Sequence, residues 1–429
     1  MSPAKRTRIA VAGPAGPRGA ARHGDRAARP DALRVVRDYP RRRDALVIGV
    51  MTGTSADAVD TALVRFEGAG AEARPRLIAY RETALDQALR REVLEVAAIA
   101  SIEPERLMRL DLALGELYAA SVLELLAVAA VDPLTVSAIG LHGQTIRHVP
   151  RAEGGGQAMS WQLGSAPVVA ARTGMLVVSD FRGGDLAAGG EGAPLVPIVD
   201  WWMFRSAEES RVLLNLGGMA NLTWLPRDGG LESVLAFDTG PGNAVIDALA
   251  GEFTHGAQRY DEGGRLAAAG RVHEGLLAEL LADEYFARTP PRSTGRERFG
   301  AAYAMELLDR AHALGLPDAD AIATATELTA ASVGAALTRF VAPRGAVDAV
   351  YGSGGGMKNP ALVAALARRV APATLAAVDA LGLEADGKEA LAFACLAHRT
   401  LCGAPGNVPS ATGAVHPVVL GRITPGRWA

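Results

Sequence analysis

The chain has very few cysteines, the residues that form the disulfides of many secreted proteins and the ligands of many zinc sites. Cys395 and Cys402 are the only cysteines among 429 residues, and neither has Cys or His neighbours at the spacing of a zinc site. Two isolated thiols predict a reduced, cytoplasmic protein without a disulfide framework. Every long apolar stretch is interrupted by charges or Gly before it reaches the length of a bilayer, so we predict no transmembrane helix.

The sequence also lacks the usual signatures of phosphoryl transfer. There is no P-loop ending in Lys-Ser or Lys-Thr, and no protein-kinase Gly-loop with its downstream motifs. The length nevertheless allows two domains, and the 49% hydrophobic content supplies substantial cores. Any phosphoryl transfer by this chain therefore needs a different architecture.

Negative charge is scarce at the N-terminus. Residues 1–44 hold twelve Lys or Arg against four Asp, a net charge of +8, which leaves −11 for the other residues because the total is −3. This segment has no apolar periodicity, so we predict a disordered basic extension. It lacks a secretory apolar region and aromatic residues that could stack on bases, which argues against a nucleic-acid partner.

Gly-rich turns inside strand-like hairpins are what the sequence does have, and they occur twice, in residues 46–60 and 212–223. Gly with small polar residues exposes backbone N–H groups to phosphate oxygens. A third Gly-rich turn, residues 352–359, follows a predicted strand and precedes a predicted helix. We expect these turns to hold a nucleotide through Gly53, Thr54, Ser55, Ala56, Asp57, Ala58, Val59, Asp60, Gly217, Gly218, Asn221, Gly354 and Gly355.

Each turn also has an ordinary explanation, in which Asp and Gly satisfy local hairpin geometry. Three such turns at strand ends favour a shared role in binding phosphate. Asp57 could hold Mg²⁺ through water, because Mg²⁺ prefers oxygen ligands and keeps part of its hydration shell.

The pattern of strands and helices predicts two α/β domains of related topology. We place the first at residues 45–197 and the second at 198–429, with the last residues able to pack back on the first. Gly and Pro punctuate residues 189–197, as expected of a hinge that closes the domains.

Two acidic residues are candidates for catalysis. Asp238 follows a predicted apolar strand and precedes Gly240 and Gly242, so its carboxylate can act as a general base or, alternatively, as a helix cap. Glu389 lies on a predicted helix of residues 388–398, where a solvated face is the default interpretation.

Polar residues after two further predicted strands suit a polar substrate. His142, Gln144 and Thr145 follow residues 136–141, while Asp180, Arg182 and Asp185 follow residues 175–179. Structural ion pairs explain the second run equally well. Residues 292–297, with two Arg, could bind an anion or form an exposed loop.

Together these motifs resemble the anhydro-N-acetylmuramic acid kinases of the sugar kinase, Hsp70 and actin superfamily, over nearly all of residues 46–425. The resemblance rests on the motifs at residues 49–60, 141–145, 180–185, 189–197, 215–223, 237–243, 293–297, 389–394 and 412–414.

The resemblance implies two related actin-like (RNase H-like) domains around an ATP-binding cleft. It implies conversion of 1,6-anhydro-N-acetylmuramic acid, water and ATP into N-acetylmuramic acid 6-phosphate and ADP, in peptidoglycan recycling. Residues 53–60 would bind ATP phosphates, Asp238 would be the catalytic base and Glu389 the second acidic residue near the sugar. Mg²⁺ would accompany ATP. A homodimer is compatible with the sequence, which does not determine the oligomeric state.

Three positions depart from the family pattern: Thr52 replaces Ser, Ala58 replaces Gly and Glu191 replaces Gln. Ala58 matters most if that position requires a positive φ. Two alternatives stay open: a kinase for another amino sugar, and a non-catalytic nucleotide or muropeptide sensor of the actin type. The two acidic residues favour an enzyme, since a sensor needs no general base.

Overall fold

The chain divides into two compact units. The computed structural model describes residues 7–9, 36–99, 101–151, 155–382 and 387–426. Unit 1 combines Met1–Val199 with Gly387–Ala429, and unit 2 is Asp200–Asp386. The C-terminal segment therefore belongs with unit 1 and not with a second domain of residues 198–429, because its helix packs on strands of unit 1. Most of the basic extension, residues 1–44, lies outside the described residues.

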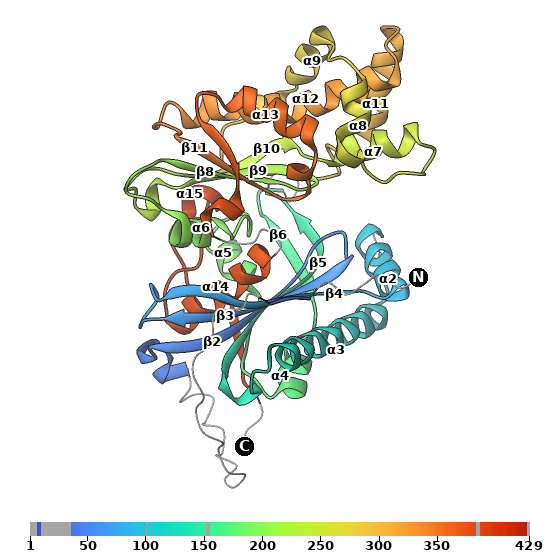
Figure 1. The fold of residues 1–429 in the computed structure, drawn as a ribbon. Coiled ribbons are helices and arrows are strands. Elements are labelled where there is room, and N and C mark those ends of the chain that lie inside the picture. Colours follow the sequence, from blue (N-terminus) through green and yellow to red (C-terminus); the bar gives the residue numbers. More distant parts are fainter. Residues whose placement is uncertain (1–6, 10–35, 100, 152–154, 383–386, 427–429) are drawn as a thin grey trace. The chain divides into compact units, whose positions relative to one another are not determined.

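The sheet of unit 1 is built around a three-stranded antiparallel meander. Its strand order is β1-β4-β3-β2-β5-β7-β13, and β6 pairs with β5. Figure 1 labels β2, β3, β4, β5 and β6. Strand β2 is antiparallel to β3 and parallel to β5, which is parallel to β7. The strands are β1 (Thr7–Ile9), β2 (Asp44–Thr52), β3 (Ala58–Glu67), β4 (Arg74–Ala84), β5 (Val136–Val149), β6 (Met159–Leu163), β7 (Val177–Ser179) and β13 (Arg422–Thr424).

Helices cover both faces of this sheet. Alternate residues such as Ile48 and Val50 enter a core with Leu114 and Tyr118 of α3, whereas α14 packs on the other face (Figure 1). The period of two along the strands determines this separation. The helices are α2 (Gln87–Ala98), α3 (Pro104–Ala129), α4 (Ala166–Thr173), α5 (Phe181–Ala187), α14 (Lys388–Leu401) and α15 (Pro409–Thr412), with 3₁₀ turns η1 (Tyr39–Arg41) and η2 (Pro133–Thr135).

The ordered fold begins before residue 45. Tyr39 of η1 is buried, and its hydroxyl lies 2.8 Å from His398 Nδ1 of α14. The His398 ring stacks on Phe66 with a centroid distance of 4.0 Å. The end of the predicted extension is therefore part of unit 1.

Helix α3 is long and apolar enough to cross a membrane by length and composition. A single such helix is weak evidence, because core helices meet the same criteria. Leu110, Leu114, Tyr118 and Val122 of α3 are buried in the core of unit 1, so its apolar character is explained by packing.

Unit 2 repeats the strand arrangement of unit 1. Its sheet order is β10-β9-β8-β11-β12, with β8 antiparallel to β9, parallel to β11, and β11 parallel to β12. The meander and the two added parallel strands thus occur in the same order as β4-β3-β2-β5-β7 of unit 1, which confirms the predicted α/β fold with two related domains. The strands are β8 (Arg211–Leu216), β9 (Met219–Leu225), β10 (Leu235–Pro241), β11 (Ala349–Ser353) and β12 (Thr374–Ala377).

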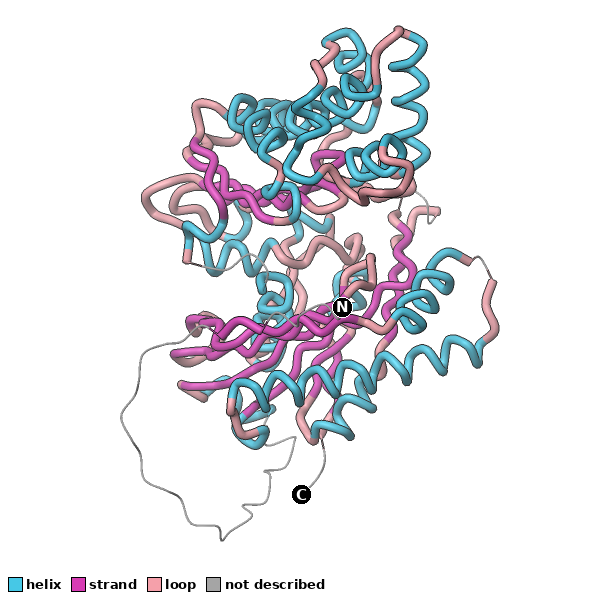
Figure 2. Tube along the Cα trace, turned by 45° about the vertical axis from the view of Figure 1, so that its right-hand side comes forward, coloured by secondary structure: helices cyan, strands magenta, loops and turns pink. Residues whose placement is uncertain are grey.

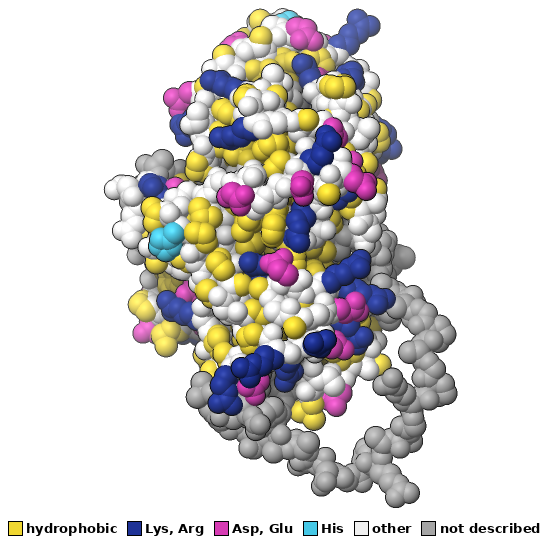
Figure 3. Space-filling view, turned by 90° about the vertical axis from the view of Figure 1, so that its left-hand side faces the viewer, with side chains coloured by type: hydrophobic (Ala, Val, Ile, Leu, Met, Phe, Trp, Pro, Cys, Tyr) yellow, Lys and Arg dark blue, Asp and Glu magenta, His cyan; other side chains and the backbone are white. Residues whose placement is uncertain are grey.

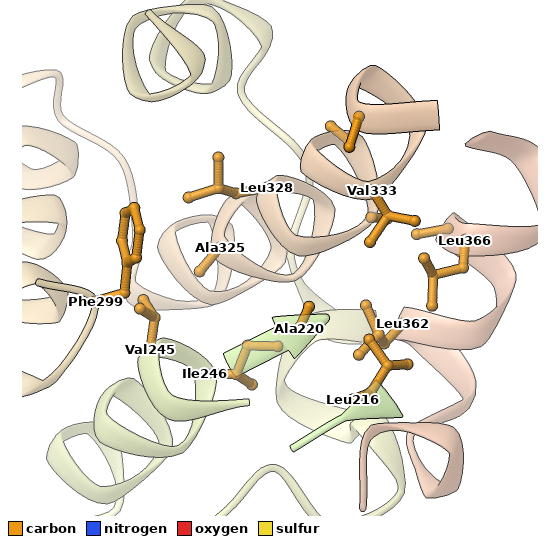
Figure 4. Close-up of a cluster of buried hydrophobic side chains, with 14 of the residues drawn as sticks. Leu216, Ala220, Val245, Ile246, Phe299, Ala325, Leu328, Val333, Leu362 and Leu366 are labelled. Atoms are coloured by element: carbon orange, nitrogen blue, oxygen red, sulfur yellow. The ribbon is translucent and has the colours of Figure 1, made fainter. Parts of the chain in front are cut away.

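One face of the unit 2 sheet carries a large helical core. Figure 4 shows Leu216 and Ala220 from the sheet directed toward the same cluster as Ala325 and Leu328 of α12. Figure 2 shows the helices of this unit beside its strands. The helices are α7 (Ala244–Phe253), α8 (Arg265–Ala269), α9 (Glu274–Leu281), α10 (Glu284–Ala287), α11 (Ala301–Ala313), α12 (Asp318–Ala336) and α13 (Pro360–Val370), with short turns η3 (Leu231–Ser233), η4 (Glu262–Gly264), η5 (Leu337–Val341), η6 (Gly355–Lys358) and η7 (Val378–Leu381). Helix α6 (Pro197–Phe204) spans the boundary between the units.

The surface in Figure 3 carries basic and acidic side chains interspersed among apolar ones. Lys and Arg side chains occur together with Asp and Glu side chains on this face.

Candidate active site

A row of polar side chains crosses the sheet of unit 2. Asn215 of β8 pairs with Asn221 of β9, which pairs with Asp238 of β10. Neighbouring residues Leu214, Leu216, Ala220, Leu222 and Phe237 belong to the helical core. Because side chains alternate along a strand, the polar row lies on the face opposite that core.

Asp238 lies inside β10 and not after it, because the strand continues to Pro241. Its Oδ2 accepts a hydrogen bond from the Thr294 N–H at 2.8 Å, and Oδ1 accepts none from the described residues. Burial raises the pKa of this carboxyl to about 7, although the Thr294 N–H and the Arg292 charge oppose the shift. The side chain keeps partial solvent access, so one oxygen is fixed and the other can take a proton.

The backbone around Asp238 is held by Arg292. Its Nε donates to the Asp238 carbonyl at 3.0 Å, and its Nη1 donates to the carbonyls of Tyr285, Phe286 and Arg288. Because these bonds occupy the guanidinium, Arg292 holds the strand and is not a free anion-binding group. An anion site at residues 292–297 stays a prediction, to which Arg292 contributes by holding the backbone in place.

The second Gly-rich hairpin turn rests on the start of helix α7. The Gly218 carbonyl accepts bonds from the N–H groups of Gly242 and Ala244, and the Gly217 carbonyl accepts one from Asn243. The turn is thus held against the first residues of the helix, and its own backbone carbonyls take the N–H groups of Gly242, Asn243 and Ala244. The N–H groups of Gly217 and Gly218 have no hydrogen-bond acceptor among the described residues, which leaves them available to phosphate.

The third Gly-rich turn meets the second at the same edge of the sheet. Ser353 of β11 pairs with Asn215 of β8. Gly354 has φ +84°, and a Cβ there would lie 2.7 Å from the Leu216 carbonyl oxygen. A Cβ on Gly356 would lie 2.6 Å from Leu216 Cβ. Only Gly permits this approach, which brings Gly354 and Gly355 beside the hairpin.

The first Gly-rich turn, in unit 1, joins β2 to β3. Its positive φ of 51° falls on Ala56, whereas Ala58 starts the extended strand β3. The replacement of Gly by Ala58 therefore carries no left-handed strain. Gln144 Nε2 donates to the Gly53 carbonyl at 3.2 Å, and Asp57 pairs with Arg90 at 2.9 Å, so both predicted binding residues also stabilise the turn.

Helix α14 approaches the sheet of unit 1 through two paired glycines. Gly49 of β2 and Gly140 of β5 are register partners. A Cβ on Gly49 would lie 1.7 Å from the Ala390 carbonyl oxygen, and one on Gly140 would lie 2.1 Å from that of Phe393. This contact places Glu389, in the first turn of α14, beside the strand that leads into the first Gly-rich turn. The Glu389 side chain reaches solvent.

The predicted sugar-binding residues of unit 1 lie in β5 and at the start of α5, just after β7. Strand β5 continues to Val149, so His142, Gln144 and Thr145 lie inside it and not after its end. Leu141 pairs with Ser179 of β7, which places His142 near the run that begins at Asp180. Arg182 Nη2 lies 3.2 Å from His142 Nε2.

The acidic residues of the run after β7 have partners within unit 1. Asp180 caps α5 through the Gly183 N–H and pairs with Arg422 at 2.8 Å. Asp185 is fully buried, where it accepts bonds from the Gly192 N–H at 2.8 Å and from Asn407 and Thr412 at 2.7 Å each. Asp185 thereby links α5 to Gly192 of residues 189–197 and to Asn407 and Thr412 near the C-terminus.

The two other departures from the expected pattern have local partners. The Thr52 hydroxyl donates to the Tyr118 hydroxyl at 2.9 Å, a bond that Ser could also make. Glu191 accepts from the Arg151 N–H at 2.9 Å and lies 3.6 Å from its guanidinium. The added negative charge is therefore paired.

Comparison with known proteins decides the family. A sequence profile described as anhydro-N-acetylmuramic acid kinase matches residues 45–426. The chain belongs to the anhydro-N-acetylmuramic acid kinase family. The protein of that name from Caldanaerobacter subterraneus subsp. tengcongensis is 41% identical over 394 residues, which cover 91% of this chain and 99% of that protein.

Two further anhydro-N-acetylmuramic acid kinases are similar at nearly full length. The Salinibacter ruber protein is 44% identical, with 90% of this chain and 97% of that protein covered. The Xanthomonas campestris pv. campestris protein is 43% identical, with 89% and 97% covered. Among solved structures, a ROK family glucokinase from Streptomyces griseus shows a weak likeness, with a TM-score of 0.33, 13% identity, and coverage of 82% of this chain and 98% of that chain.

Two features of the site were not predicted from the sequence. Asn215 was not singled out, although its pairing with Asn221 places it in the polar row of this family member. The Thr294 N–H is a backbone group, so no residue type could have indicated its bond to Asp238. Two signals could have indicated Asn215: it is a polar residue between Leu214 and Leu216, and it is the first residue of the motif at residues 215–223.

Proposed function

We propose that this member of the anhydro-N-acetylmuramic acid kinase family uses ATP and water to convert 1,6-anhydro-N-acetylmuramic acid into N-acetylmuramic acid 6-phosphate and ADP. This reaction serves peptidoglycan recycling, and the supply of ATP places it in the cytoplasm. The observation that carries the proposal is Asp238, a half-buried carboxyl with one anchored oxygen and a pKa raised to about 7. A base with a pKa near the operating pH balances ionisation against basicity.

Asp238 takes a proton from the water that attacks C1 of the sugar. The C1–O6 bond breaks, and O6 attacks the γ-phosphorus of ATP with ADP as the leaving group. The proton on Asp238 then passes to solvent. Glu389, at the N-terminal turn of α14, is the second acidic residue toward the sugar.

The Gly-rich turns hold the phosphates of ATP. The free N–H groups of Gly217 and Gly218 are suited to phosphate oxygens, and Gly354 and Gly355 adjoin them at the same sheet edge. In unit 1, residues 53–60 supply further N–H and hydroxyl groups. Stabilisation of charge on the transferring group is the main catalytic requirement of phosphoryl transfer.

Mg²⁺ accompanies ATP in this proposal. No group of three or more His, Cys, Asp or Glu side chains suited to a metal occurs among the described residues. Mg²⁺ needs no such group, because phosphate and water oxygens can supply most of its ligands. Asp57 would contribute through water while its pairing with Arg90 keeps it in place.

An isotope experiment tests the reaction. Purified protein is mixed with Mg·ATP and 1,6-anhydro-N-acetylmuramic acid in ¹⁸O-water, and the product is analysed by mass spectrometry. We expect one ¹⁸O at C1 of a 6-phosphorylated sugar. Release of ADP without sugar phosphate, or equal activity on other anhydro amino sugars, would contradict the proposal.

A further inference from the structure

Arg296 lies against the second Gly-rich turn. A Cβ built on Gly218 would lie 3.5 Å from Arg296 Nε and 3.7 Å from its Nη2. The guanidinium is therefore beside the turn whose Gly217 and Gly218 N–H groups have no acceptor among the described residues. A phosphate bound by these N–H groups would lie within reach of the guanidinium, and all three residues belong to unit 2.

The guanidinium of Arg296 has no hydrogen-bond acceptor and no carboxylate within ion-pair distance on the part of the chain that the structure describes. The two arginines nearest to it in sequence are occupied, because Arg292 donates to backbone carbonyls and Arg298 pairs with Asp283. The Arg296 side chain is exposed, so a ligand can reach it. Unpaired arginines are common on protein surfaces, and the position beside Gly218 distinguishes this one.

Asp247 of α7 is the acidic residue whose pKa reflects the charge of Arg296. Burial raises the pKa of Asp247 to about 6, while Arg296 opposes this shift and Asp261 adds to it. Asp247 is therefore largely ionised at neutral pH and attracts the guanidinium toward α7, against whose start the Gly-rich turn rests. Because no ion pair forms between them, the N–H groups of Arg296 stay free for another anion.

One loop carries both Arg296 and the group that anchors Asp238. The Thr294 N–H donates to Asp238 Oδ2 at 2.8 Å, and Arg296 follows Thr294 by two residues. A Cβ on Gly300 would lie 2.1 Å from the Arg296 carbonyl oxygen, so close packing fixes the backbone at this point. The loop therefore connects the proposed base to the turn proposed for the phosphates.

We propose that Arg296 is a further catalytic residue, which binds the γ-phosphate of ATP and stabilises the negative charge on the phosphoryl group during its transfer. The inference rests on the function proposed above. Asp238 acts on the sugar, and the terminal phosphate is the one that meets the sugar, so the cation on the Asp238 loop meets that phosphate. A guanidinium donates two parallel hydrogen bonds to phosphate oxygens, and bonds that strengthen in the transition state raise kcat.

Steady-state kinetics test this role. The kcat and the KM for ATP are measured for the wild type, Arg296→Gln and Arg296→Lys with 1,6-anhydro-N-acetylmuramic acid as the sugar. We expect Arg296→Gln to lower kcat by about 1,000-fold, the low end of the effect of an arginine on a transferring phosphoryl group, and to raise the KM for ATP by no more than about tenfold. Arg296→Lys should recover part of the loss, since Lys keeps the charge without the fork. The control Arg265→Gln removes an exposed arginine of unit 2 that pairs with Glu262 and should keep kcat within about twofold.

Binding measurements assign the contact to the terminal phosphate. Calorimetry gives the Kd of ADP and of a non-hydrolysable ATP analogue for the wild type and Arg296→Gln, without turnover. We expect the analogue to bind about tenfold more weakly to the variant and ADP to bind within about twofold of its wild-type Kd. Equal weakening of both nucleotides, or an unchanged kcat, would overturn the assignment.

The pH dependence separates direct contact from an effect on the base. The charges that act on the pKa of Asp238 come from Arg292 and Glu297, so the kcat/KM profile of Arg296→Gln should level off at the same pH as that of the wild type. A shifted profile would show that Arg296 acts through Asp238 and would overturn the proposal. A wild-type protein whose nucleotide binding depends on Arg296 as expected, but which forms no sugar phosphate, would overturn the proposed function instead.

Discussion

Replacement of Asp238 by Asn should stabilise the protein while it abolishes activity. The Asn Oδ1 can accept the Thr294 N–H bond that Asp238 Oδ2 accepts now, so the fold around β10 is kept. What disappears is the cost of ionising a desolvated carboxyl. The removal of a proton acceptor should lower kcat by at least about 100-fold.

The size of the stability gain follows from the pKa of Asp238. Burial raises it from 3.8 to about 7, and each pKa unit corresponds to about 1.4 kcal/mol. The upper bound is therefore about 4 kcal/mol, which partial solvent access reduces to about 1–3 kcal/mol. Below pH 4 the carboxyl is protonated in the folded and unfolded chains and contributes nothing. Between pH 4 and 7 the unfolded chain ionises first, so the wild type loses stability as pH rises, and above pH 7 the difference is constant.

Urea unfolding of the wild type and Asp238→Asn at pH 4, 5.5, 7 and 8.5 measures this difference. The free energy of unfolding of the variant should exceed that of the wild type by an amount that grows from pH 4 to 7 and then levels off. A difference that does not depend on pH would refute the reasoning that burial raises this pKa. Loss of stability in the variant at pH 7 and 8.5 would show that the ionised carboxylate holds the strand.

Three other predictions concern packing, the buried network and catalysis. Gly140→Ala should destabilise unit 1 by about 3 kcal/mol or more in urea unfolding, because its Cβ would lie 2.1 Å from the Phe393 carbonyl oxygen. The control Gly251→Ala, whose Cβ would have its nearest contact at 3.8 Å, should be neutral or stabilising. Equal losses of stability in the two variants would refute the packing argument. Asp185→Asn should cost about 2–4 kcal/mol of thermal or urea stability, since an amide cannot accept all three bonds and one donor stays buried without an acceptor; an unchanged melting temperature would contradict the role of this network. The kcat/KM of the wild type should rise with pH and level off above about pH 7, because only ionised Asp238 accepts a proton, and a profile that falls over this range would exclude it as the base.

The sequence was informative where a residue type has a local meaning. The Gly-rich turns, the helices that begin at Pro104 and Pro360, and the acidic residues Asp238 and Glu389 could all be picked out from type and spacing. The repeat of the hairpin also predicted two related domains, since similar local patterns fold into similar units. The predicted strand ends were less accurate. The change from apolar to polar residues predicted that the strands end before His142 and Asp238, but β5 and β10 continue past these residues.

Tertiary structure decided what these residues contact. Only the strand register aligned Asn215, Asn221 and Asp238, and only packing of α14 on Gly49 and Gly140 assigned the C-terminal segment to unit 1.

Two arginines in the predicted site segments show the difference most clearly. Arg292 and Arg182 both stand among small and polar residues, so their types and sequence neighbours do not distinguish them. Folding surrounds Arg292 with carbonyl oxygens and leaves Arg182 beside the imidazole of His142. The sequence by itself therefore determined the family, the pair of related domains and the chemical groups available. The tertiary structure decided which charges are already satisfied, because burial and hydrogen bonding depend on neighbours that are distant along the chain.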